Sequence, residues 1–571
     1  MRKLSILLLF LATSIPGWAQ DPLVGAGKTI DPYHIKSLKS GTFQHAAVAS
    51  AHPLASSVGL EIMKRGGNAF DAAIATQLAL AVVYPVAGNI GGGGFLLGRK
   101  ADGKLLGLDF RETAPAKASR DMYLDAKGNA QTQLSQYGHL ASGTPGTIAG
   151  LFATLPYAKL PFKELIQPAI DLAEHGFVLT AREASGLNNT ASDFIKYSTQ
   201  ASALANKKTW HAGDTLIQKA LAITLKRIRD KGQKGFYEGK TARLIVAEMK
   251  RKNGIISLQD LKNYQVKARI PLSFNYKGHQ VIGFPPPSSG GIILAQMMKM
   301  LEARKLDSLG FHTPQSVQLM IEAERRAFAD RAEHLGDPDF WQVPVDKMMS
   351  DTYLKNRLSD FQEGVASKSK DITAGNFKES EQTTHLSILD SEGNMVSVTT
   401  TLNGAFGSKT IVGGAGFLLN NEMDDFSIKP GVANMYGAVG GNANAIAANK
   451  RMLSSMCPTL VLKNKQPYVV IGTPGGTTIP TSVFQDVLNI IDFKLGAKEA
   501  INAPKFHHQW LPDEVAVEKN FPNLLREQLV KMGYKITERE TIGRMEVIVV
   551  NGQGKLEAAA DKRGDDSVAG Y

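Results

Sequence analysis

Thr383 is the residue of this sequence whose position best suits nucleophilic chemistry. It follows a polar, Ser/Lys/Gly-rich segment at 362–382, whose composition predicts a flexible connector. An internal threonine is a poor nucleophile without a base. Cleavage between Gln382 and Thr383 would free an α-amino group with a pKa of about 7.7–8.0, which can accept the hydroxyl proton near neutrality. The position therefore predicts an inactive precursor that is activated by a cut before Thr383, although a Thr-Thr pair at a strand start also arises from β-propensity alone.

A predicted hairpin brings a second hydroxyl to Thr383. The β-branched runs at 384–390 and 395–402 flank a four-residue loop, which is typical of a hairpin. In the simplest register Thr383 lies opposite Leu402, and a shift by one residue puts it opposite Thr401. Facing and diagonal neighbours on a hairpin lie within about 5–8 Å of each other. We therefore expect the Thr383 and Thr401 hydroxyls to lie close together.

Helical spacing dominates the chain before residue 362. The pattern of apolar residues predicts helices at 56–65, 69–83, 215–231, 292–303 and 314–334. Thr215 and Gln218 suggest a capping pair for the third helix. The fifth contains Arg325, Arg326 and Asp330, which indicate a solvated or salt-bridged face. After residue 383 the texture changes, and strands are predicted at 459–462, 468–472 and 545–550.

Length and charge limit the classes of function. The chain has 571 residues and a formal net charge of +12. This length predicts two or more structural units, or one large α/β domain. The net positive charge favours anionic ligands. The sequence has no patterned basic motif, which argues against nucleic-acid binding. The glycines at 91–94 lack a phosphate-binding frame and predict a tight turn.

The first residues have the three parts of an export signal. A basic start at 1–3 precedes an apolar run at 4–12, and Gly17 and Ala19 suit a cleavage site. We therefore expect 1–19 to be a signal peptide and the protein to be periplasmic or secreted, with a buried N-terminal helix as the alternative. No later segment is apolar and long enough to span a membrane.

Cysteine and histidine give no sign of a metal or a cofactor. Cys457, the single cysteine, is expected to be a small buried side chain. His507 and His508 are adjacent, so their rings diverge rather than converge on one ion, and we expect a structural role. No metal and no cofactor is expected.

Eight segments of the chain are long motifs that are specific enough to compare with a known protein family. They are DFRETAPAKA from Asp109, HLASGTPGT from His139, PPPSSGG from Pro285, QTTHLS from Gln382, LLNNEMDDF from Leu418, KRMLSSMCPT from Lys450, GTPGGTT from Gly472 and APKFHHQWLPDE from Ala503. In these segments the chain resembles the bacterial γ-glutamyltranspeptidases, also called glutathione hydrolases, which are N-terminal nucleophile hydrolases. The resemblance covers nearly the whole chain after the signal segment.

The resemblance implies an α+β fold, a four-layer αββα sandwich. It implies self-cleavage by attack of the Thr383 hydroxyl on the Gln382 carbonyl through an ester. A large subunit, 20–382, and a small subunit, 383–571, would stay associated. The implied reaction moves the γ-glutamyl group of glutathione or a related amide to water, an amino acid or a dipeptide.

The resemblance also implies which residues bind the γ-glutamyl head of the substrate. Arg111 would bind the α-carboxylate through a bidentate contact, with Ser454 and Ser455 as added hydroxyl donors. Asp425 would bind the α-ammonium. Asn403 and Glu422 would assist Asp425.

Further roles follow from the same resemblance. Thr401 would hydrogen-bond Thr383 and hold its rotamer. Gly475 and Gly476 would form the oxyanion hole, although Pro474-Gly475-Gly476 could be a plain turn. The segment 434–441, with Tyr436, resembles a lid loop.

Two alternatives stay open. One is an acylase of the same superfamily that acts on a glutaryl or cephalosporin-type side chain. Such a substrate lacks the α-amino group, so Asp425 would be left unpaired. The other is an inactive exported binding protein of the same fold, which the presence of Thr383, Thr401 and both glycines opposes.

Overall fold

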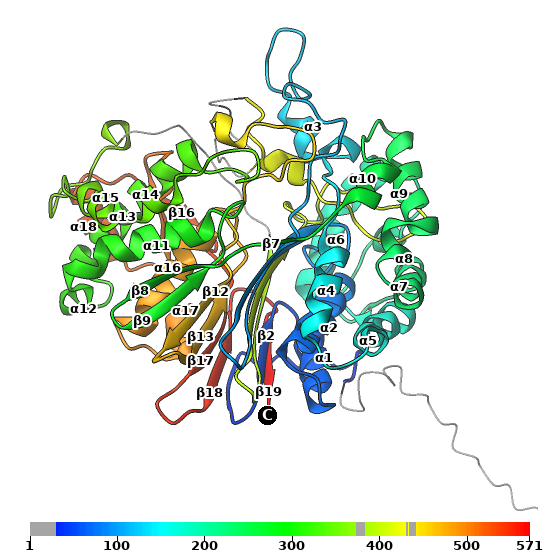
Figure 1. Cartoon of the computed structure of the whole chain (residues 1–571), viewed down its shortest axis with the longest axis horizontal. Helices are drawn as coiled ribbons and strands as arrows, with labels where there is room; N and C mark the ends of the chain where they lie inside the picture. The colour runs from blue at the N-terminus through cyan, green and yellow to red at the C-terminus, as the bar shows by residue number, and fades with distance from the viewer. Residues whose placement is uncertain (1–29, 373–382, 430–431, 433–434, 436–440) are drawn as a thin grey trace, which may run out of the picture.

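Two seven-stranded antiparallel sheets lie face to face at the centre of the protein (Figure 1). The computed structural model describes residues 30–372, 383–429, 432, 435 and 441–571. In spatial order, the first sheet contains β1 (Ser40–Phe43), β18 (Leu556–Ala560), β17 (Glu546–Val550), β13 (Gln466–Gly472), β12 (Thr459–Lys463), β9 (His279–Gly283) and β8 (Leu272–Tyr276). The second contains β19 (Ser567–Gly570), β2 (Ala47–Ser50), β10 (Thr384–Leu389), β11 (Met395–Thr401), β3 (Gly93–Arg99), β4 (Leu105–Asp109) and β7 (Lys267–Ala268).

Helices cover the outer face of each sheet (Figure 1). The first sheet is covered by α11 (Gly290–Leu301), α16 (Thr478–Ile491) and α17 (Ala497–Asn502), with α13 (Pro314–His334) packed on α11. The second is covered by α1 (Pro53–Lys64), α2 (Ala69–Val83) and α4 (Thr147–Thr154), with α5 (Phe162–His175) packed on α2 and α7 (Lys219–Lys231) on α5. The predicted α+β, four-layer αββα sandwich is confirmed.

Smaller elements complete the described chain. The remaining α-helices are α3 (Thr132–Gln136), α6 (Ala181–Tyr197), α8 (Lys234–Tyr237), α9 (Gly239–Arg251), α10 (Leu258–Asn263), α12 (Leu306–Leu309), α14 (Val345–Met349), α15 (Asp351–Arg357) and α18 (Asn523–Lys531). The remaining strands are β5 (Phe177–Val178), β6 (Thr215–Leu216), β14 (Phe506–His507), β15 (Val515–Glu518) and β16 (Ile536–Arg539).

Most predicted helices are confirmed, and one begins later than expected. The bounds of α2 and α13 match the prediction. The predicted helix at 215–231 is wrong in its first turn, because Thr215 and Leu216 form β6, which pairs with β5. The Gln218 side chain donates to the Val82 carbonyl instead of capping the helix. The end of the helix at Gly232 is confirmed.

The charged helix α13 is buried rather than solvated. Arg325 and Arg326 are each 1% exposed. Arg326 pairs with Glu322 at 2.5 Å and with Asp360 at 2.7 Å. The salt-bridged interpretation is confirmed and the solvated one is wrong, because α13 lies between α11 and α18. Buried charges of this kind need such partners.

Part of the predicted connector is docked on the fold. Trp510 donates its indole N–H to the carbonyls of Ser369 and Ile372. Ser369 and Ile372 are themselves buried. The end of the described part of this segment therefore packs on the fold, whereas 362–365 are exposed. Residues 373–382 lie outside the described residues.

The hairpin of β10 and β11 has the shifted register. Thr384 pairs with Thr400 and Leu389 pairs with Met395. This register places Thr383 opposite Thr401, which is one of the two arrangements that the sequence allowed. The predicted strands at 459–462, 468–472 and 545–550 correspond to β12, β13 and β17.

Hydroxyl groups join the two sheets across their interface. Ser397 Oγ donates to the Ile471 carbonyl at 3.1 Å, and Ser387 Oγ donates to the Glu546 carbonyl at 3.0 Å. His385 contacts Thr399 Oγ1 at 2.8 Å through its Nδ1. Burial lowers the pKa of His385 to about 3, so its ring is neutral. His385 is therefore a packing residue between the sheets.

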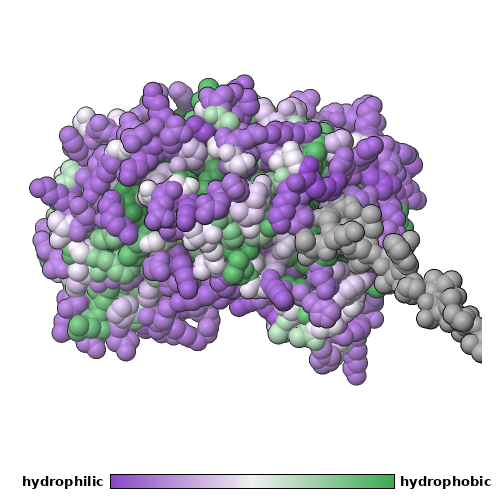
Figure 2. Space-filling view, turned by 90° about the horizontal axis from the view of Figure 1, so that it is seen from below, coloured by the Kyte–Doolittle hydropathy of each residue, from purple (hydrophilic) through white to green (hydrophobic). Residues whose placement is uncertain are grey.

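Hydrophilic residues cover most of the face seen from below, with hydrophobic residues in smaller areas between them (Figure 2). No helix among the described residues has the length and apolar character needed to cross a bilayer. Cys457 is fully buried, and burial raises the pKa of its thiol to about 12. The prediction of a small buried side chain is confirmed.

Asp390 holds the hairpin turn onto helix α2. Its carboxylate accepts from the backbone N–H groups of Glu392, Asn394 and Ala69, at 2.8 to 3.0 Å. We expect Asp390→Ala to lower the free energy of unfolding by about 1–3 kcal/mol, because it leaves these N–H groups without their acceptor. Urea denaturation followed by circular dichroism measures the change. Asp102→Ala, in an exposed turn, is the control, and equal losses in both variants would contradict the prediction.

Candidate active site

Thr383 lies at the start of β10 and is 6% exposed. Thr401, opposite, accepts a hydrogen bond at its Oγ1 from the Asn403 backbone N–H at 2.7 Å. Asn403 has a φ of +72°, which asparagine tolerates better than most residues. The bend after β11 thus holds the Thr401 hydroxyl in place beside Thr383.

A glycine turn follows β13 on the same side of the sheets. Gly475 and Gly476 have φ angles of +139° and +56°. A Cβ on Gly475 would lie 2.5 Å from Thr478 Oγ1. The Gly475 carbonyl accepts from the Thr478 N–H and hydroxyl. The N–H groups of Gly475 and Gly476 have no acceptor among the described residues, so both are available to bind a negative oxygen next to the start of α16.

A small polar cavity of about 30 Å³ lies beside Thr383. The predicted site residues that line it are Arg111, Thr383, Thr401, Asn403, Glu422, Asp425, Ser454, Ser455 and Gly476. Gly475 lines an adjoining cavity, which Thr383 also borders. The lid residue Tyr436 and the cleavage residue Gln382 lie outside the described residues. The structure therefore brings every described site residue to Thr383.

Arg111 is surrounded by carboxylates. Its guanidinium pairs with Glu422 at 2.5 Å and with Asp425, and Glu112 lies 3.6 Å away. The Arg111 side chain is 1% exposed. Arg111, the predicted ligand of the substrate carboxylate, thus pairs with Glu422 and Asp425, the predicted ligands of the substrate ammonium.

Burial and the neighbouring charges shift the pKa values of Arg111 and of the carboxyl groups around it. Burial raises the pKa values of Glu422 and Asp425, and the nearby Arg111 partly opposes that rise. Burial raises the pKa of Glu112 to about 8. For Arg111, burial is outweighed by the charges of Glu422 and Asp425, which raise its pKa. Such perturbed groups around one cavity are typical of functional sites.

The two serines are held by the segment before α11 and by α13. The Ser454 N–H donates to the Pro287 carbonyl at 2.9 Å, and the Ser454 carbonyl accepts from the Ser289 N–H at 2.7 Å. Ser455 Oγ accepts from Arg331 Nη2 at 3.0 Å. The PPPSSGG segment thus holds in place the two serines that line the polar cavity.

Arg331 is a site residue that the sequence did not single out. It lines the polar cavity, is 8% exposed, and adds positive charge near Asp425. Its helical spacing does not distinguish it from Arg325 and Arg326 on the same helix. Only the packing of α13 against the serine segment reveals its position.

The family model for γ-glutamyltranspeptidase matches residues 55–571 of the chain. The chain belongs to the γ-glutamyltranspeptidase family. It is 44% identical to a glutathione hydrolase proenzyme from Escherichia coli (strain K12), over 100% of this chain and 99% of that protein. This family member is also 35% identical to an acylase proenzyme, ACY 1, from Pseudomonas sp. (strain V22), over 92% of this chain and 94% of that protein. The fold resembles a cephalosporin acylase from Bacillus halodurans, with a TM-score of 0.82, 28% identity and coverage of 95% and 99%.

Asp424, next to the site, predicts a pH-dependent contribution to stability. It accepts from the Met435 N–H at 2.5 Å and from the Ser135 hydroxyl, and burial raises its pKa from 3.8 to about 7. Between these two pH values the unfolded chain is ionised at Asp424 while the folded chain keeps the proton. The carboxyl group therefore destabilises the fold increasingly as pH rises from about 4 to about 7.

We expect the stability of Asp424→Asn relative to the unsubstituted protein to rise over this pH window and to level off above it. Urea denaturation at a series of pH values measures the difference, in which the other titrating groups cancel. A difference that stays constant from pH 4 to pH 8 would contradict the prediction.

Proposed function

We propose that this protein is a γ-glutamyltransferase and glutathione hydrolase with Thr383 as its N-terminal nucleophile. It takes the γ-glutamyl group of glutathione or a related amide and passes it to water, an amino acid or a dipeptide. The observation that carries the proposal is the polar cavity beside Thr383, which is lined by two arginines and by the carboxylates of Glu422 and Asp425, both paired with Arg111. The family relationship supports the same reaction.

The charges of this cavity suit a γ-glutamyl head. The head has one α-carboxylate and one α-ammonium, and both need opposite charges once they leave water. Arg111, with Ser454 and Ser455, suits the carboxylate, while Glu422 and Asp425 suit the ammonium. The cavity is lined by charges of both signs, Arg111 and Arg331 with Glu422 and Asp425, so a head with one carboxylate and one ammonium meets a partner for each group.

The chemistry proceeds in two acyl-transfer steps. The Thr383 hydroxyl attacks the γ-carbonyl carbon, and the free α-amino group of Thr383 takes its proton. The N–H groups of Gly475 and Gly476 stabilise the negative oxygen of the tetrahedral intermediate. Thr401 holds the Thr383 hydroxyl in position. The leaving amine takes the proton, and the resulting Thr383 ester is then attacked by water or by an acceptor amine.

Maturation and export belong to the same proposal. Self-cleavage between Gln382 and Thr383 gives subunits 20–382 and 383–571, and they stay associated because β10 and β11 from the small subunit pair with β2 and β3 from the large one. Such a proenzyme is consistent with the name of the relative from E. coli. The basic start, apolar run and small residues of 1–19 support export to the periplasm or the medium.

A related acylase activity is the second candidate, because an acylase and a cephalosporin acylase are among the relatives. The pairing of Arg111 with Asp425 and Glu422 argues for γ-glutamyl substrates. A glutaryl side chain has no ammonium group, so it could not pair with Asp425 and Glu422 when Arg111 binds the substrate carboxylate. An inactive binding protein is opposed by the presence of Thr383, Thr401 and the glycine turn together at one site.

The nucleophile can be tested by substitution. We expect the unsubstituted protein to run on a denaturing gel as fragments of about 39 and 20 kDa, in proportion to the lengths of the two subunits within the 61.6 kDa chain. Thr383→Ala should remain one chain without activity, because it lacks the attacking hydroxyl, and Thr383→Ser should cut and react more slowly. A small fragment that does not begin with Thr383, or a γ-glutamyl product from Thr383→Ala, would contradict the assignment.

The substrate class can be tested with two chromogenic amides. We expect kcat/KM for γ-glutamyl-p-nitroanilide to exceed that for the glutaryl analogue by about 100-fold or more, because a site built for a polar group rejects an analogue that lacks it. Asp425→Asn should reduce this preference, since it weakens the ammonium site. Faster release from the glutaryl compound would favour the acylase.

A further inference from the structure

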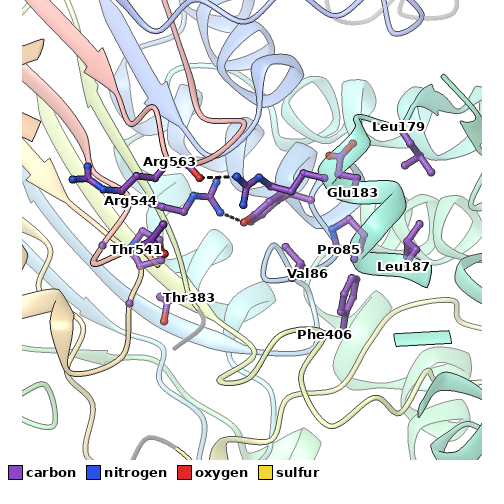
Figure 3. Close-up of a pocket in the computed structure, with 16 residues that line it drawn as sticks. Pro85, Val86, Leu179, Glu183, Leu187, Thr383, Phe406, Thr541, Arg544 and Arg563 are labelled. Atoms are coloured by element: carbon purple, nitrogen blue, oxygen red, sulfur yellow. Dashed lines mark hydrogen bonds between the residues drawn. The ribbon is translucent and has the colours of Figure 1, made fainter. Parts of the chain in front are cut away.

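Thr383 also borders a second, larger cavity (Figure 3). This cavity has a volume of about 230 Å³, against about 30 Å³ for the polar one. The side away from Thr383 has apolar residues, Leu179 and Leu187, together with the carboxylate of Glu183, and Phe406 also lines the cavity (Figure 3). The small cavity holds the mutually paired Arg111, Glu422 and Asp425, which suit a γ-glutamyl head.

The reaction needs space on both sides of Thr383. If the γ-glutamyl head lies in the polar cavity, the amine half of the substrate must leave in another direction. Attack of an amine on the Thr383 ester is the reverse of acylation by an amide, so an acceptor amine must approach along the path that the leaving amine took. The larger cavity borders both Thr383 and Gly475, and it satisfies this requirement.

Three arginines line the larger cavity, and two are already paired. Arg544 pairs with Asp566 at 2.8 Å and contacts the Tyr84 hydroxyl. Arg563 pairs with Glu518 at 2.5 Å and with Asp561 at 3.0 Å.

Arg182 differs from these two. It donates from Nη2 to the Arg563 carbonyl at 2.8 Å (Figure 3) and has no carboxylate partner among the described residues. Its side chain is exposed. The neighbouring Glu183 contacts His52 at 3.0 Å and accepts from the Thr180 N–H at 2.8 Å, and it forms no ion pair with Arg182 among the described residues. Arg182 thus remains available to an anionic ligand in the cavity.

We propose that the larger cavity binds the amine partner of the reaction, and that Arg182 selects amines with a free carboxylate. The ligand class is an amino acid or a short peptide whose apolar parts contact Leu179, Leu187 and Phe406. Its neutral amine attacks the acyl carbon of the Thr383 ester, the ester C–O bond breaks, and the amine proton passes to the Thr383 oxygen through the α-amino group. This inference rests on the proposed function and adds a second binding site to it.

Acceptor kinetics with γ-glutamyl-p-nitroanilide as the donor test the proposal. We expect Arg182→Ala to raise the KM for glycylglycine about two- to fivefold, as the loss of an exposed charge-assisted contact predicts. The KM for glycylglycinamide, which lacks the carboxylate, should change little, so the preference for glycylglycine is lost. Arg243→Ala removes an exposed arginine of α9 that borders neither cavity, and it should leave the preference intact.

A donor comparison gives an independent readout. The leaving group of glutathione has a carboxylate and p-nitroaniline has none, so Arg182→Ala should raise the ratio of the two donor KM values by a similar factor. An unchanged preference between glycylglycine and its amide in Arg182→Ala would overturn the acceptor-site proposal. Failure of the unsubstituted protein to release p-nitroaniline without an acceptor would instead overturn the proposed function.

Discussion

The site depends on the close approach of the two central sheets at Gly472. A Cβ at this position would lie 2.2 Å from the His385 ring, so only glycine lets β10 and β13 approach this closely. Thr383 precedes His385 by two residues, and Gly475 follows Gly472 by three. The contact therefore sets the distance between the nucleophile and the glycine turn. A ring that burial keeps neutral can occupy this interface without a counter-ion.

A second constraint is electrostatic. Glu112, Glu422 and Asp425 are taken out of water around one Arg111, an arrangement that costs desolvation energy and does not by itself stabilise a fold. The fold tolerates it because the surrounding segments are held by hydrogen bonds that do not involve the ligand, such as those between Ser454 and the residues before α11. The polar cavity thus holds buried groups of both charges, and a zwitterionic head can provide a partner for each of them.

Thr383 borders two cavities of different character, and in our proposal one recognises the acyl group while the other binds the amine that leaves or attacks. The small, charged cavity can discriminate the acyl group, because each buried charge needs a specific partner. The larger, mostly apolar cavity imposes weaker demands on shape, and in our proposal Arg182 provides its main polar contact. One nucleophile can therefore combine a strict donor requirement with a broader choice of amines.

The sequence by itself determined the boundaries of α2 and α13 and the existence of the hairpin. Through its resemblance to a family it also implied the layers, and it predicted the nucleophile and the other site residues. These features are local or are carried by contiguous motifs. It left the hairpin register open, because the length of the loop did not fix which residues pair, and it misplaced the start of α7, where Gln218 bonds to distant Val82. Only the tertiary structure showed that the end of 362–372 is docked, that Arg331 reaches the polar cavity, and that Arg182 borders a second one. Each of these depends on contacts between segments far apart in the chain, whose geometry no local pattern records.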